Sequence, residues 1–188
     1  MSVFERSDRA LRAIEKAGVV VAGVLMFAIM VVVVTDVVMR YFFNSPLSWS
    51  YELISLYLMV GLFFFSLSDT LAHDAHVAVD ILHLYMSPRM RHAAELVGYV
   101  LAIPVFAAVC YLSAVTTWES FHGGDVLAGH IPWPTWLAQI CVPLGVGVLV
   151  LRMAFRAVGH AVSLAAGRSV IALPPVSGVE EATAEESI

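Results

Sequence analysis

Histidine is the residue type in this chain best suited to hold a haem iron, so the positions of the histidines matter first. Haem in a membrane protein is held axially by histidines near mid-bilayer on facing helices. Every histidine here lies instead at the end of an apolar run or in a loop: His73, His76, His83, His92, His122, His130 and His160. The sequence therefore predicts no haem and no other cofactor.

A divalent metal ion is the next ligand to consider. His76, Asp80 and His83 are spaced so that they would share one face of a helix. Three such residues without a fourth ligand are more typical of a solvated polar face than of a metal site. We therefore expect no metal, and we keep His76 and Asp80 as candidates for a structural or subunit-interface role.

Ionisable side chains inside the membrane mark transport and proton-relay sites. The apolar runs of the sequence contain none at mid-span. We therefore expect no catalytic residue, and we expect that the protein is not an enzyme. Asp36 and Arg40 follow the first apolar run, residues 17–35, and lie four residues apart. This spacing and order favour an ion pair on a helix. Glu52 and Trp49 lie just beyond a turn, so we expect Arg40 and Glu52 to meet at one interface. These four residues are structural or subunit-interface candidates.

The composition identifies the class of protein that positions these residues. Of 188 residues, 60% are hydrophobic and 13% are charged, against about 45 to 50% and about 25% in soluble domains. The net charge is -5, and no basic cluster interleaves with aromatic residues, which excludes nucleic-acid binding. Cys110 and Cys141 lie inside apolar runs and predict no disulfide. The chain is expected to lie in a lipid bilayer.

Four long apolar stretches lack Asp, Glu, Lys and Arg, and they are residues 17–35, 53–68, 96–118 and 131–151. A helix needs about 20 apolar residues to cross the hydrocarbon core of a bilayer. We therefore expect an all-α integral membrane protein with a four-helix membrane domain over 17–155. The expected spans are about 17–39, 50–72, 94–118 and 131–152.

The distribution of basic residues predicts the orientation of these spans. Nine Lys or Arg residues fall on the side that holds both termini, and Arg40 alone falls on the other. Cytoplasmic segments are enriched in Lys and Arg, so both termini are expected inside, with 1–16 as a cytoplasmic segment. Residues 156–188 are expected to form a cytoplasmic tail, disordered from about 174, where prolines and glutamates replace aromatic residues.

The segment between spans two and three has a pattern of its own. Val77, Ile81 and Leu84 would share one face of a helix over about 75–86, opposite the polar residues. An amphipathic helix in the membrane interface fits this pattern, whereas an unpaired strand edge there would be costly. Small residues in the spans, such as Gly23, Gly98 and Gly145, would permit close packing against a larger membrane partner.

Three motifs occur in a specific order. They are RYFFNSPLSWSYEL at 40–53, HVAVD at 76–80, and IPW at 131–133 followed by VPLG at 142–145 and Arg152. With four spans and inward termini, this arrangement resembles the small membrane subunit, of DctQ type, of tripartite ATP-independent periplasmic (TRAP) transporters. Gly61, Ser66 and Ala72 depart from that family's usual pattern without moving a span.

The resemblance implies a scaffold rather than a transport site. It implies a bacterial or archaeal inner-membrane subunit that supports a large membrane subunit in ion-coupled uptake of organic acids. A periplasmic substrate-binding protein would deliver those acids. The alternatives are a haem-bearing membrane anchor of an electron-transfer complex and a small autonomous exporter, which would need a membrane-embedded acid. Substrate and coupling ion stay open.

Overall fold

The computed structural model describes residues 3–73, 86–127 and 131–166. Their helices are α1 (Val3–Phe43), α2 (Ser50–Leu53), the π-helix η1 (Ile54–Leu58), α3 (Met59–Ala72), α4 (Pro88–Gly123), α5 (Thr135–Gln139) and α6 (Cys141–Ala166). Within these ranges the only β-type pairing is an isolated bridge between Val126 and Pro134. The expected interfacial helix at 75–86 and the tail from 174 lie wholly or almost wholly outside the described residues.

Four helical segments are long and apolar enough to cross a membrane, as the sequence predicted. They cover Arg6–Phe43, Ser50–Ala72, Arg89–Gly123 and Thr135–Ala166. The second is built from α2, η1 and α3 in direct succession. The fourth combines α5 and α6, which are separated at Ile140. Pro143 has no N–H to bond the Gln139 carbonyl, so a break in the helix is favoured at this point.

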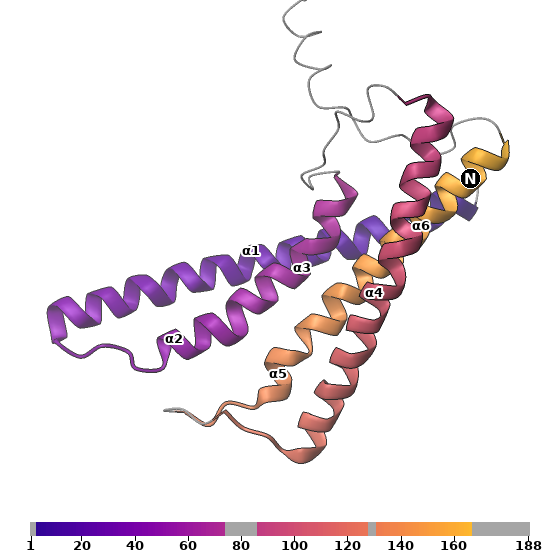
Figure 1. The fold of residues 1–188 in the computed structure, drawn as a ribbon. Helices are drawn as coiled ribbons and strands as arrows, with labels where there is room; N and C mark the ends of the chain where they lie inside the picture. Colours follow the sequence, from indigo (N-terminus) through magenta and orange to yellow (C-terminus); the bar gives the residue numbers. More distant parts are fainter. Residues whose placement is uncertain (1–2, 74–85, 128–130, 167–188) are drawn as a thin grey trace, which may run out of the picture.

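The helices form two hairpins (Figure 1). α1 packs against the segment from α2 to α3, while α4 packs against α6, and α3 joins the hairpins by packing on α6. Figure 1 shows the hairpins crossing near the N-terminus and diverging toward the other end. The hydrophobic core lies where they cross and includes Tyr99, Leu149, Met153 and Ala157.

Glycine sets how closely α3 and α6 approach. A Cβ added to Gly145 on α6 would overlap the carbonyl group of Phe64 on α3. Gly145 was predicted from the sequence to contact another protein, but in the structure it packs against α3 of the same chain. By contrast, a Cβ at Gly23 on α1 or at Gly98 on α4 would meet nothing within 4 Å. Those two glycines remain free for contact with lipid or a partner.

Candidate functional site

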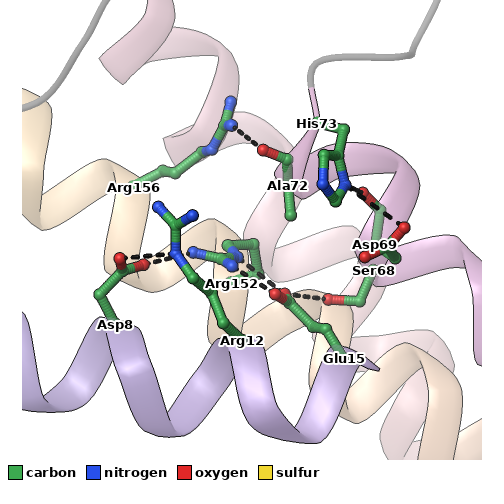
Figure 2. A network of polar contacts seen from close by, with 9 residues as sticks. All are labelled: Asp8, Arg12, Glu15, Ser68, Asp69, Ala72, His73, Arg152 and Arg156. Atoms are coloured by element: carbon green, nitrogen blue, oxygen red, sulfur yellow. Dashed lines mark hydrogen bonds and ion pairs between the residues drawn. The ribbon is translucent and has the colours of Figure 1, made fainter. Parts of the chain in front are cut away.

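A buried ion pair joins α1 to α6 where the hairpins cross. Arg152 donates from Nε to Glu15 Oε1 at 2.7 Å, and a terminal nitrogen of the same guanidinium bonds Glu15 Oε2. The two residues are 4% and 3% exposed. Figure 2 shows Glu15 and Arg152 pointing toward each other from their two helices. This bidentate geometry is among the stronger forms of side-chain hydrogen bonding.

Three further side chains complete the network. Ser68 on α3 donates to Glu15 Oε1 at 2.7 Å, and Arg152 also donates to Asp8 Oδ1 at 2.8 Å. Arg12 donates from Nε to the other Asp8 oxygen at 2.8 Å. The two acids and two arginines therefore balance in charge. Burying ions costs several kcal/mol each, and this cost is offset only when partners are well placed, so the network fixes α1, α3 and α6 in one register.

Arg156, also on α6, links this helix to α3 and α4. Arg156 donates to the Ala72 carbonyl at 3.0 Å and to the Tyr99 hydroxyl at 3.3 Å. Ala72 is the last residue of α3, where helix carbonyls lack intrahelical partners and a cation is favourable. Arg156 therefore caps α3 and holds it against α4 and α6.

Two buried histidines lie at the same end of the molecule. The Nδ1 atoms of His92 on α4 and His160 on α6 are 2.9 Å apart and share a hydrogen bond. The His160 ring is stacked on Tyr99, with centroids 5.8 Å apart. Because the imidazoles bond each other directly, no space for an iron remains between these two nitrogens. This arrangement fits a packing contact rather than axial haem ligation.

The turn between α1 and α2 is organised by Asp36. One oxygen of Asp36 accepts from Arg40 at 2.7 Å, and the other accepts from the Leu47 backbone N–H at 2.8 Å. Asp36 is 14% exposed at its side chain and Arg40 is 62% exposed. Ser50 then donates to the Leu47 carbonyl at 2.8 Å. Asp36 thus provides a side-chain link between the turn and α1, beside the backbone hydrogen bond from Ser45 N–H to the Met39 carbonyl.

The other predicted site residues divide into two groups. Trp49 and Glu52 are half-buried at the start of α2, and no ion pair joins Arg40 to Glu52 among the described residues. Glu52 Oε2 is buried without a hydrogen-bond partner in the described chain. His76, Asp80 and His83 lie outside the described residues, so their roles stay predictions.

The two hairpins also touch away from the point where they cross. The Tyr57 hydroxyl in η1 donates to the Pro134 carbonyl at 2.9 Å, and its ring lies 5.9 Å from that of Trp133. This contact was not predicted from the sequence, and neither was the burial of Glu15 and Arg152. The expected boundaries placed Glu15 in the cytoplasmic segment 1–16 and Arg152 at the end of the fourth span. The position of Arg152 directly after an apolar run was the available signal.

The described residues offer little for chemistry. They contain no group of three His, Cys, Asp or Glu side chains that could hold a metal ion. A cavity of about 550 Å³ between α4, α5 and α6 is lined by Trp118, Phe121 and Trp136 among apolar neighbours, with no charged side chain. An anionic substrate would find no counter-charge there.

Four long apolar helices, three of which are tied together by a charge network at one end, define a multi-pass α-helical membrane protein. The family model described as "Tripartite ATP-independent periplasmic transporters, DctQ component" matches residues 29–164. Because this match covers most of the sequence, the chain belongs to that family, the small membrane subunit of TRAP transporters, as the motifs predicted. The family is a transporter component rather than an enzyme family. No curated protein and no solved structure gave a match.

Proposed function

We propose that this chain is the scaffold subunit that supports the large membrane subunit in ion-coupled uptake of organic acids. A periplasmic binding protein delivers the acids in this proposal, and both termini face the cytoplasm of a bacterial or archaeal inner membrane. The proposal combines the family membership with the way the chain uses its charges.

The observation that carries the scaffold role is the pairing of Glu15 with Arg152. Among the described residues, these are the only Asp, Glu, Lys or Arg side chains that are buried. Each neutralises the other, and the pair holds helices together. A subunit that bound an anionic substrate in the membrane would need a positive side chain or helix end available to that substrate. Here the buried cation is already committed to helix packing.

The apolar surface of the chain supports a second element of the proposal, contact with a membrane partner. Only 6% of the most apolar 18-residue stretch of α1 is buried within the chain, and the same fraction holds for α4. Large side chains such as Met26, Phe27 and Leu101 are exposed. Open glycines beside them, Gly23 and Gly98, allow a neighbouring helix to approach closely.

Co-purification tests the proposal. A tagged copy of this chain, co-expressed with the large membrane subunit of the same transporter, should recover that subunit in mild detergent. Recovery of this chain alone under the same conditions would contradict the scaffold role. The haem-anchor alternative is tested on the same sample by an absorption spectrum, in which a Soret band would support that alternative.

A further inference from the structure

A second cavity lies beside the ion network, at the boundary between the charged and apolar parts of α1. Its volume is about 400 Å³, and it lies between α1, the end of α3 and α6. Arg12, Lys16 and His73 contribute to its wall, with Val19 on the apolar side. Figure 2 shows Arg12 among the network residues, with Asp69 and His73 beyond them on the neighbouring helix.

The two carboxylates that line this cavity, Glu15 and Asp69, already have partners within the chain. Glu15 accepts from Arg152 and Ser68. Asp69 lies 3.3 Å from the His73 ring nitrogen. Lys16, in contrast, is exposed and forms no ion pair or hydrogen bond within the described residues. Arg12 uses Nε for Asp8 and is 72% exposed at its side chain, which leaves its terminal nitrogens available.

The depth of the cavity restricts what fills it. Lys16 is the last charged residue before the apolar run of α1, and Val19 is one turn inside that run. A bilayer changes from headgroups to hydrocarbon at the same boundary. Exposed basic side chains at that level attract anionic lipid headgroups. The exposed apolar side chains of Val19 and Val20 then continue from the cavity along α1, where an acyl chain would lie.

We propose that this cavity binds the headgroup of an anionic phospholipid. Lys16 and the terminal nitrogens of Arg12 contact the phosphate, and Val19 contacts the start of an acyl chain. The inference is independent of the transport role, since it requires only that the four helices span a bilayer. It assigns the two cations a specific ligand in addition to their contribution to membrane orientation.

Lys16→Gln is the main test variant, because Lys16 has no partner in the described chain to lose. Arg12→Gln/Lys16→Gln is the stronger variant, and Arg6→Gln/Arg9→Gln is its matched control, with two charges removed from the same helix outside the cavity. The full chain is purified from membranes, exchanged into phosphatidylglycerol or phosphatidylcholine, and analysed by native mass spectrometry and thermal unfolding.

We expect saturable retention of phosphatidylglycerol over phosphatidylcholine and a higher unfolding midpoint with the anionic lipid. Lys16→Gln should weaken this binding roughly fivefold, the equivalent of about 1 kcal/mol for one basic residue. The double variant should weaken it further, while the Arg6/Arg9 control keeps most of it.

Three results would overturn the proposal. Equal losses in the cavity variants and the control would show general surface attraction. An equal rise in unfolding midpoint with inorganic phosphate alone would show that free phosphate, not lipid, is the ligand. Unchanged lipid retention in Lys16→Gln, with poorer recovery of the large subunit, would assign the cavity to an acidic side chain of that partner.

Discussion

Arg152 on α6 donates both hydrogen bonds of a bidentate pair to Glu15 on α1, which lies 137 residues earlier in the chain. The first and last spans are thereby fixed to each other directly, and Ser68 adds the second span to the same carboxylate. This ion pair joins α1 to α6 through two charges that lie at the ends of apolar runs. We expect the proposed scaffold role to depend on this pair.

Breaking the Glu15–Arg152 pair should lower the free energy of unfolding. Arg152→Met leaves the buried Glu15 carboxylate without its cation, and removing one partner of a buried pair typically costs about 3 to 5 kcal/mol. Unfolding titrations in detergent measure the loss. The double variant Glu15→Met/Arg152→Met should recover most of it, because two apolar side chains of similar size bury no charge. Exposed Arg89→Met is the control. A single variant as stable as the parent would contradict the burial of this pair.

The glycines provide a test of helix packing. Gly145→Ala should destabilise the fold by roughly 1 to 3 kcal/mol, because the new methyl group overlaps the Phe64 carbonyl. Gly98→Ala, with open space around it, should be neutral or stabilise its helix by about 0.5 to 1 kcal/mol. The measurement is the difference in unfolding free energy between the two variants. If both glycines tolerate alanine equally, α3 and α6 do not approach as described.

The turn after α1 should depend on Asp36 more than on Arg40. Asp36→Ala removes the acceptor of the Leu47 N–H as well as the ion pair, whereas Arg40→Ala removes only an exposed partner worth about 0 to 1 kcal/mol. We expect a lower yield of the complex with the large subunit for Asp36→Ala. Glu52→Ala should also lower it, while the substrate affinity of the binding protein stays unchanged. Equal, negligible effects at Asp36, Arg40, Glu52 and the control Arg89 would show that this turn is not part of the contact with the large subunit.

Orientation can be measured directly. In a background that lacks Cys110 and Cys141, a cysteine at position 125 should react with an impermeant reagent in intact cells. A cysteine at position 89 should not react, because the distribution of basic residues predicts a cytoplasmic location for it. Asp125 and Arg89 are both exposed, so burial does not confound the result. Labelling at 89 alone would mean that the topology is inverted.

The number of long apolar helices could be predicted from the sequence because charge-free runs of about 20 residues have few structural alternatives. The Asp36–Arg40 pair was predictable for a similar reason, since four residues along a helix bring two side chains together. The pairing of Glu15 with Arg152 was not predictable, because it depends on how separate helices pack. Nor was the role of Gly145, since a glycine in an apolar run does not reveal which helix it contacts.

Reconstituted uptake tests the scaffold account most directly. Proteoliposomes would contain this chain alone, the large subunit alone, or both, each with the binding protein and an ion gradient. We expect no uptake by this chain alone and binding-protein-dependent uptake when both subunits are present. We also expect Arg152→Met to reduce uptake in proportion to the complex recovered. Uptake by this chain without the large subunit would contradict the central claim.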